Sequence, residues 1–137
     1  MFLTLNIVSL KKNLYYKNIK YVVLTGEKGN FSVYVQHAHL ITFIKPGIIN
    51  VVQSSNFSEK LYTSKGIVEV QPRLVNLISD YFFNITHLDK KKLLKKKKII
   101  ENKYNKINIE RNLNIFRKYK DILKKIKILE KIKKNKN

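Results

Sequence analysis

The sequence predicts a domain of short antiparallel β-strands followed by an α-helical segment. Apolar and polar residues alternate with a period of two in several short runs of the first segment, which is typical of half-buried strands. All four glycines and both prolines lie in that segment, where they separate the runs. The apolar spacing then changes to three and four residues, the period of an amphipathic helix.

Length and cysteine content bound the class of protein. The 137 residues suffice for one compact domain or for a small domain with an appendage. The absence of cysteine excludes a disulfide framework, a thiolate zinc site and a cysteine nucleophile. No apolar run approaches the roughly 20 residues that span a bilayer. The N-terminal residues lack a basic region ahead of a long apolar stretch, so we expect a soluble intracellular protein without a secretory signal.

The charge is strongly positive and unevenly distributed. Lys and Arg number 29 against 9 Asp and Glu, a net charge of +20. Lysine, isoleucine and asparagine make up 59 of the 137 residues, and their codons are rich in A and T, so genomic bias could raise all three together. Residues 1–86 carry nine basic and four acidic groups, whereas residues 87–137 carry twenty and five. We therefore expect a domain boundary near Thr86, between units of residues 1–86 and 87–137.

Eight runs rich in β-branched and aromatic residues predict the strands of the first unit. Short strands separated by turns favour an antiparallel sandwich or a flattened barrel. The Gly26-Glu-Lys-Gly29 segment is interpreted as a hairpin turn rather than a phosphate-binding loop, because Phe31 opens another strand and no helix follows. The runs are Leu3–Ile7, Ile19–Thr25, Phe31–Val35, Leu40–Ile44, Ile48–Gln53, Lys60–Thr63, Ile67–Val70 and Leu74–Ser79.

Two helices joined by a turn are expected in the second unit. Thr86-x-x-Asp89 fits a capping box at the start of a helix that runs to about Asn102. An asparagine-rich turn follows, over residues 102–108. Such a pair forms an α-hairpin whose narrow apolar face is too small for independent stability. The second helix has its apolar stripe at Ile115, Tyr119, Ile122, Ile126 and Leu129.

Signatures of enzymatic chemistry are absent from the sequence. His37 and His39 are a candidate metal pair, but no third ligand is evident nearby, which favours a contact role in a loop or at a strand edge. No serine lies in a nucleophile-elbow motif, and the acidic residues of the first unit are scattered. The sequence therefore predicts a protein that is not an enzyme and that holds no metal or cofactor.

The sharpest charge feature is the stretch Lys-Lys-Lys-Leu-Leu-Lys-Lys-Lys-Lys at residues 90–98. It is interpreted either as a solvated helix face or as a surface that binds an acidic protein, an anionic ligand or nucleic acid. A small basic RNA-binding protein of ribosomal type is the alternative function. Tyr15, Tyr16 and the aromatic residues 81–83 would then be its candidate stacking residues.

Three segments in register resemble the epsilon subunit of F-type ATP synthases, of the bacterial type. The stretch from Leu24 to Gly47 has the Gly-x-x-Gly turn, a strand, His-Ala, a Leu-containing strand and the Pro-Gly turn of that family. The stretch from Tyr62 to Pro72 contains Gly-Ile-Val-Glu-Val, and Leu3-x-Leu-x-Ile-Val-Ser9 is similar to the first strand. Order and spacing run without gaps through residue 89.

The resemblance implies a β-sandwich of about ten strands, a helical hairpin and a non-catalytic rotor role. In that family the sandwich binds the gamma subunit and the c-ring, and so couples proton transport to ATP synthesis. The hairpin contacts the beta and alpha catalytic subunits transiently and can inhibit ATP hydrolysis. A peripheral position on the cytoplasmic face of the bacterial inner membrane follows, with neither nucleic acid nor a second copy of the chain expected as partner.

The resemblance also implies roles for individual residues. Contacts to gamma and the c-ring would fall to Glu27, Lys28, Asn30, His37 and His39. The basic regulatory face would be Lys90, Lys91, Lys92, Lys95 and Lys96.

Two positions depart from the family pattern. The family's Pro-Gly before His-Ala is Val35-Gln36 here. The ATP motif Ile/Leu-Asp-x-x-Arg-Ala is reduced to Asp89 and Lys92, and a lysine cannot replace a bidentate guanidinium. We therefore expect no tight ATP sensing.

Overall fold

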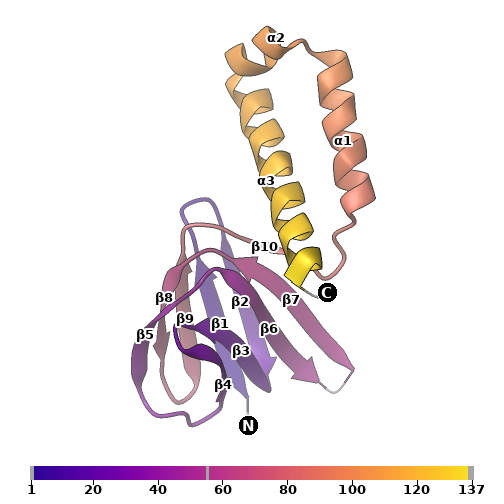
Figure 1. The fold of residues 1–137 in the computed structure, drawn as a ribbon. Helices are drawn as coiled ribbons and strands as arrows, with labels where there is room; N and C mark the ends of the chain where they lie inside the picture. The colour runs from indigo at the N-terminus through magenta and orange to yellow at the C-terminus, as the bar shows by residue number, and fades with distance from the viewer. Residues whose placement is uncertain (1, 55, 136–137) are drawn as a thin grey trace. The chain divides into compact units, whose positions relative to one another are not determined.

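The computed structural model describes residues 2–54 and 56–135 (Figure 1). The chain divides into two compact units, Met1–His87 and Leu88–Asn137. The division lies one residue beyond the boundary expected from composition. The first unit consists of β-strands and the second of α-helices, which confirms the predicted fold class.

The described part of the first unit contains ten strands, two more than the residue pattern alone predicts and as many as the resemblance implies. They are β1 (Leu3–Val8), β2 (Asn13–Ile19), β3 (Tyr21–Gly26), β4 (Gly29–Tyr34), β5 (Leu40–Ile44), β6 (Gly47–Ser54), β7 (Phe57–Thr63), β8 (Gly66–Val70), β9 (Leu74–Ser79) and β10 (Phe82–Asn84).

The strands pair in one continuous order that folds over itself into two layers. One layer is β10-β7-β6-β3, with β4 paired to the other side of β3, and the second layer is β5-β8-β9-β1-β2. A single residue pair, Gly26 with Ile44, joins β3 to β5 and so links the layers. All pairings are antiparallel except that of β1 with β9, which is parallel.

The core lies between the two layers and follows the alternation in the sequence. Leu3, Leu5 and Ile7 of β1 are all fully buried, while the residues between them are partly exposed. Leu77 of β9 and Phe82 of β10 complete the same core from neighbouring strands. Each alternating run therefore contributes one face to the interior, as the period of two requires.

The two strands that the residue pattern missed are irregular or very short. In β2 the register shifts between the pairs Leu3–Ile19 and Leu5–Tyr16, and Asn18 has a φ of 57°. This bulge shifts the side chains that follow it to the other face, so the period of two is lost from the sequence. β10 has only three residues, too few for any period to be read.

A hydrogen bond between the layers closes the sandwich on the side of β2. The hydroxyl of Tyr16 on β2 donates to Oε2 of Glu59 on β7 at 2.5 Å. The side-chain amide of Asn84 donates to the same carboxylate oxygen at 2.9 Å. Burial, together with the hydrogen bond and the charge of Glu59, raises the pKa of the Tyr16 hydroxyl well above its usual 10.0.

Up to residue 135, the second unit has three helices: α1 (Lys90–Lys103), α2 (Lys106–Arg111) and α3 (Leu113–Asn135). The expected turn over residues 102–108 is therefore wrong in part, because α1 runs to Lys103 and a short helix starts at Lys106. Asn105 makes that helix possible: its side chain accepts a hydrogen bond from the Asn108 amide at 2.8 Å and so caps the first turn.

The capping box predicted from Thr86 and Asp89 is also wrong. Asp89 is itself the N-cap of α1, and its carboxylate accepts from the Lys91 amide at 2.9 Å. Thr86 belongs to the sandwich unit, where its hydroxyl oxygen accepts from the Lys60 amide at 2.8 Å. The Asp of a Thr-x-x-Asp sequence can thus be the N-cap of the helix itself when the hydroxyl of the Thr is already hydrogen-bonded elsewhere.

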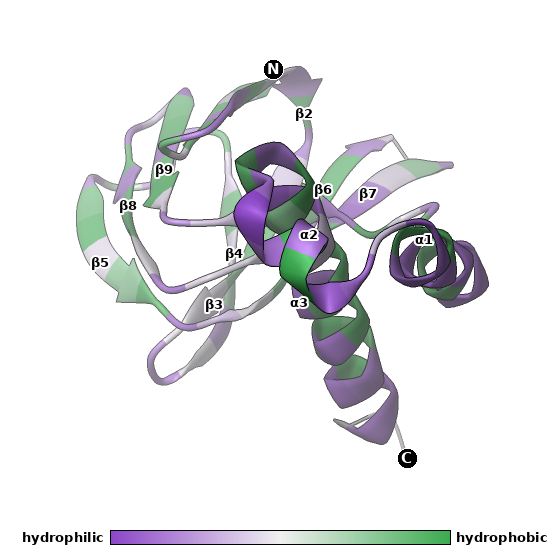
Figure 2. Cartoon of the chain, turned by 90° about the horizontal axis from the view of Figure 1, so that it is seen from above, coloured by the Kyte–Doolittle hydropathy of each residue, from purple (hydrophilic) through white to green (hydrophobic). Residues whose placement is uncertain are grey.

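α1 and α3 run antiparallel and form the predicted hairpin. Lys90, at the start of α1, pairs with Glu130 of α3 at 3.2 Å. At the other end of α1, Glu101 accepts a hydrogen bond of 2.6 Å from the Tyr119 hydroxyl of α3. Hydrophobic residues recur among hydrophilic ones along α3, as expected of a helix with an apolar stripe (Figure 2).

Candidate functional site

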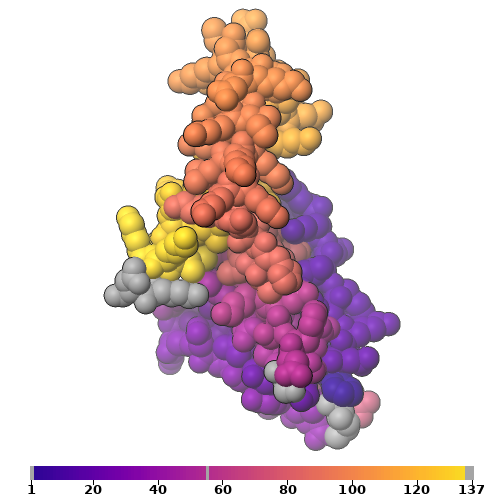
Figure 3. Space-filling model, turned by 90° about the vertical axis from the view of Figure 1, so that its right-hand side faces the viewer, coloured from indigo at the N-terminus to yellow at the C-terminus, as the bar shows by residue number. Residues whose placement is uncertain are grey.

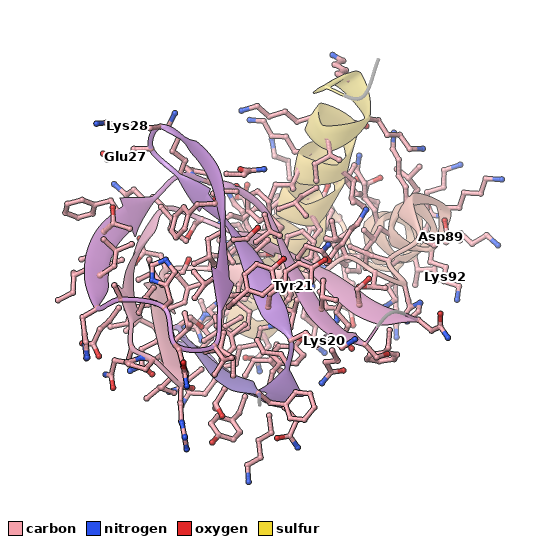
Figure 4. The ribbon with its side chains drawn as sticks, turned by 90° about the horizontal axis from the view of Figure 1, so that it is seen from below. Lys20, Tyr21, Glu27, Lys28, Asp89 and Lys92 are labelled. Carbon is pink, nitrogen blue, oxygen red and sulfur yellow. The ribbon has the colours of Figure 1, made fainter. Side chains whose placement is uncertain are left out.

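The β3–β4 hairpin presents a two-residue tip at the end of the sandwich. Gly26 pairs with Gly29, so Glu27 and Lys28 alone form the turn, and both side chains extend into solvent (Figure 4). Gly29 has a φ of 129°, which other residues rarely adopt. A Cβ on Gly26 would lie 2.8 Å from the Gly29 carbonyl oxygen. Both glycines are thus required, and the predicted hairpin turn is present.

The five residues expected to contact gamma and the c-ring are not brought together. Glu27, Lys28 and Asn30 lie at the tip of the β3–β4 hairpin. His37 and His39 follow the other end of β4, in the irregular loop before β5. Because β4 is six residues long, at about 3.4 Å per residue the two groups lie roughly 17 Å apart along the strand. They therefore form two separate surfaces.

The histidines are in a loop rather than on a strand face. The Nδ1 atom of His37 lies 2.7 Å from the Ala38 carbonyl oxygen, so this ring nitrogen is engaged locally. Gln36, just before it, has a φ of 64°, and its amide donates to the Pro72 carbonyl oxygen at 2.5 Å. Among the described residues no group of three His, Asp or Glu side chains gathers as a metal site would require.

An exposed apolar row crosses the outer face of the β5-β8-β9 layer beside the hairpin tip. Phe43 pairs with Ile67, Ile67 pairs with Ile78, and Ile78 pairs with Val8 of β1. The first three side chains are 59%, 44% and 60% exposed. Four neighbouring strands thus present apolar side chains to solvent in one line, which we call the apolar row (Phe43, Ile67, Ile78 and Val8).

The apolar row has polar neighbours on the same face. In the next register row, Ile41 is followed by Glu69, Asn76 and Asn6. On the other side, a shallow groove of about 480 Å³ runs along the row, and its charged lining residues come from the turns. An apolar strip rimmed by polar groups is typical of a protein-binding surface. Those charged residues are Glu27, Lys65 and Asp80.

Sequence reasoning missed the apolar row, although a signal was present. In β5, Leu40–Ile44, four of the five residues are apolar, and β8 has apolar residues on both of its faces near Ile67. A strand with one solvated face would show polar residues at Ile41 and Phe43. The loss of alternation in an edge-accessible layer could therefore have marked the surface.

The basic face of α1 is smaller than expected, because Lys90 is already paired with Glu130. Lys91, Lys92, Lys95 and Lys96 are exposed. Side chains of α1 project outward along the helix in the space-filling view (Figure 3). The face is thus a row of solvated cations on one helix, with the first lysine turned toward α3.

Asp89 and Lys92, which remain from the family's ATP motif, have different surroundings. The Asp89 carboxylate caps α1, and Lys92 lies one turn later with its side chain exposed (Figure 4).

The RNA-binding alternative requires exposed aromatic rings, but Tyr16, Phe82 and Phe83 are buried in the sandwich, at 8%, 1% and 3% exposure. These three rings are therefore core residues and offer no stacking platform for bases, whereas the candidate Tyr15 is exposed and Tyr81 is half-buried.

Comparisons with known proteins agree on one family. Residues 2–85 match the family described as the beta-sandwich domain of the ATP synthase delta/epsilon chain. The chain is 34% identical over 89 residues to the ATP synthase epsilon chain of Psychrobacter arcticus, and to the same degree to that of Psychrobacter cryohalolentis. Each alignment covers 65% of this chain and 64% of the relative, so it spans less than two thirds of the relatives' length.

Solved structures share the fold over nearly the whole chain. One is a chain of the Euglena gracilis mitochondrial ATP synthase, with a TM-score of 0.61, 15% identity, and coverage of 96% of this chain and 81% of that one. Another is a chain of the Tetrahymena thermophila mitochondrial ATP synthase central stalk and c-ring, with a TM-score of 0.55, 12% identity and 96% coverage of both.

Proposed function

This chain belongs to the ATP synthase delta/epsilon chain family as an epsilon-type central-stalk chain, and on that premise we propose that its sandwich joins the gamma subunit to the c-ring. The family membership confirms the resemblance drawn from the residues. The chain would couple proton transport to ATP synthesis without catalysing a reaction itself. It would be peripheral to the cytoplasmic face of a bacterial inner membrane; no helix in the described part of the chain is long and apolar enough to cross a bilayer.

The apolar row is the observation that carries the gamma contact. Exposed Phe43, Ile67 and Ile78 leave apolar area in water that a packed partner would cover. Full burial of one such side chain is worth roughly 1.5–3 kcal/mol, so three provide a core for an interface. The polar neighbours Glu69 and Asn76 would form its rim.

The hairpin tip is the proposed contact to the c-ring. Glu27, Lys28 and Asn30 are exposed, polar and carried on a turn fixed by two glycines. The polar loops of a c-ring are matched better by this polar tip than by the apolar groove beside it. The histidine loop of His37 and His39, at the other end of β4, would contact gamma by a second surface.

The helical unit is proposed to act on the catalytic subunits. Lys91, Lys92, Lys95 and Lys96 could face acidic residues of the beta and alpha subunits and so restrain ATP hydrolysis. Lys90 is left out of this face because of its pair with Glu130. With Asp89 used as a helix cap and Lys92 in place of arginine, tight ATP binding is not expected.

Co-purification of gamma with an Ile67→Thr/Ile78→Thr variant tests the gamma contact. Threonine keeps the β-propensity of these exposed positions while it removes apolar area, so the sandwich should still fold. The loss of about 2–3 kcal/mol of burial predicts a fall in gamma affinity of roughly 30- to 150-fold. The matched control Phe57→Thr changes a residue that is 51% exposed on β7 and should leave gamma binding unchanged.

Unchanged recovery of gamma with the double variant would remove the apolar row from the interface. Exchange of the two tip charges, Glu27→Lys with Lys28→Glu, should weaken recovery of the c-ring more than that of gamma, because only Glu27 also lines the groove beside the apolar row. Competition with total RNA at roughly 0.15 M salt separates a packed interface from exposed charge. Gamma displaced by RNA would favour the RNA-binding function.

A further inference from the structure

The helical unit contains a cleft of its own, at the end where α2 joins α1 to α3 (Figure 1). Its volume is about 800 Å³, which is within the range of sites that bind small molecules. All three helices or their junctions contribute to the lining, so the cleft exists only while α1, α2 and α3 are held together. Its apolar side chains are those of Tyr104, Ile109, Phe116, Tyr119 and Leu123.

The polar groups of this lining are largely engaged within the chain. The Tyr119 hydroxyl donates to the Glu101 carboxylate at 2.6 Å, and the Asn105 side chain caps α2 by accepting from the Asn108 amide. A sugar or a heterocyclic base buried here would need hydrogen-bond partners for its own polar groups. An aliphatic chain needs none, so the lining favours an aliphatic chain.

Lysines at the rim of the cleft favour a negative charge at one end of that chain. Lys106 and Lys120 both line the cleft and are exposed, and the Lys120 ammonium lies 5.3 Å from the centre of the Phe116 ring. Glu101 and Glu110 also line it, but residues 87–137 carry twenty basic groups against five acidic ones. This surplus attracts an anion and repels an organic cation.

We propose that the cleft binds a long-chain fatty acid, with the carboxylate at Lys106 and Lys120 and the chain among the apolar side chains. This site goes beyond the proposed contacts to gamma, the c-ring and the catalytic subunits, which use other residues. A ligand that touches all three helices binds only the folded hairpin and therefore stabilises it by mass action.

Calorimetric titration of the full chain with laurate and with decanoate tests the proposal, at roughly 0.15 M salt and below the concentration at which laurate aggregates. Decanoate has two fewer CH₂ groups, so it should bind roughly 15-fold more weakly if the chain is buried. Binding through charge alone would give both carboxylates the same affinity, and that result would overturn the proposal.

Two pairs of matched variants on α3 locate the site. Leu123→Asn should lower laurate affinity roughly ten-fold, whereas Leu113→Asn, at a leucine that is 58% exposed and outside the lining, should leave it unchanged. Lys120→Ser should lower it roughly three-fold, whereas Lys118→Ser removes the same charge outside the cleft and should have no effect. Equal losses within both pairs would overturn the proposal. If Leu123→Asn loses its helical far-UV signal, the exposed lysine pair decides alone.

Hydrogen exchange tests the coupling to the hairpin. With laurate at ten times its dissociation constant, the amides of α1 and α3 that exchange by unfolding of the helical unit should exchange about 11-fold more slowly, and sandwich amides should not change. Displacement of laurate by ATP but not by decanoate would assign the cleft to a nucleotide and overturn the proposal. Neither gamma nor the c-ring is present in these measurements, so their failure is distinct from a failure of the rotor role.

Discussion

The sandwich and the helical unit differ sharply in how much apolar surface each buries. Among the described residues, 19 buried apolar side chains lie in the sandwich and three in the helical unit, Leu93, Ile109 and Ile126. The sandwich carries five positive charges net and the helical unit fifteen. Most of the free energy of folding therefore resides in the sandwich, since hydrophobic burial is its main favourable source.

The helical unit depends on partners more than the sandwich does. Lysines four residues apart on α1, such as Lys91 with Lys95 and Lys92 with Lys96, repel one another by roughly 0.2–0.5 kcal/mol per pair. In the described part of the hairpin, the contacts between α1 and α3 include a narrow apolar stripe, the ion pair of Lys90 with Glu130 and the hydrogen bond from Tyr119 to Glu101. We infer that the sandwich is a stable platform and that the helical unit gains stability from whatever neutralises its charge.

The largest effect is expected from matched leucine truncations in the two units. Leu77→Ala removes a fully buried side chain of β9 and should lower the stability of the sandwich by about 3 kcal/mol, through lost burial and the cavity left behind. Leu93→Ala, in α1, should reduce the helical far-UV signal while the protection of sandwich amides from hydrogen exchange stays unchanged. Equal loss of sandwich protection in both variants would contradict the separation of the two units.

A smaller effect is expected where the two layers of the sandwich are joined. Tyr16→Phe removes the hydrogen bond to the Glu59 carboxylate and should cost about 2 kcal/mol near neutral pH in urea unfolding. Because folding raises the pKa of this hydroxyl above 10.0, the folded state favours the neutral form. The stabilisation is therefore complete below pH 10 and is lost progressively as the pH rises above it.

The control for this prediction is Tyr15→Phe, which alters an exposed hydroxyl on the same strand. It should change stability by less than about 0.5 kcal/mol at any pH. A difference between wild type and Tyr16→Phe that stays constant from pH 8 to beyond pH 10 would show that the hydroxyl does not titrate with folding.

The smallest effect concerns the histidine loop, and it is stabilising. Gln36 has a φ of 64°, a left-handed conformation that costs a residue with a Cβ about 1–2 kcal/mol and costs glycine little. Gln36→Gly keeps the amide that donates to Pro72, so the free energy of unfolding should rise by about 0.5 kcal/mol after the lost side-chain contacts of Gln36 and the greater chain entropy of glycine are counted. The control Gln53→Gly, on β6 with ordinary backbone angles, should lower it.

Most of the fold could be predicted from the sequence because the pattern was local. Apolar and polar residues alternate in the run Leu3–Ile7, and the apolar ones are those that are buried in the structure. β2 was missed because the bulge at Asn18 breaks the alternation of its apolar residues, and the position of a bulge cannot be predicted from the residue pattern. The short helix α2 lies where the residue pattern predicts a turn, because asparagine, which caps this helix at position 105, is also typical of loops.

The candidate site could be predicted only in part. Glu27 and Lys28 were placed on a hairpin tip from the glycines around them, and the structure has that tip. The strand predicted at Phe31–Val35 already puts them at the opposite end from His37, so the grouping of all five residues as one contact came from the resemblance and not from the residue pattern. The pairing of Lys90 with Glu130 was out of reach, since those residues lie forty positions apart.

The family, the fold class and the contrast between an apolar sandwich and a lysine-rich hairpin can be predicted from the residues alone. Alternation, turn residues and charge are properties of neighbours in the chain, and they act before any long-range contact forms. Which outward residues lie side by side depends instead on how the strands pair. Phe43, Ile67 and Ile78 come from three separate strands, and register alone makes them one surface.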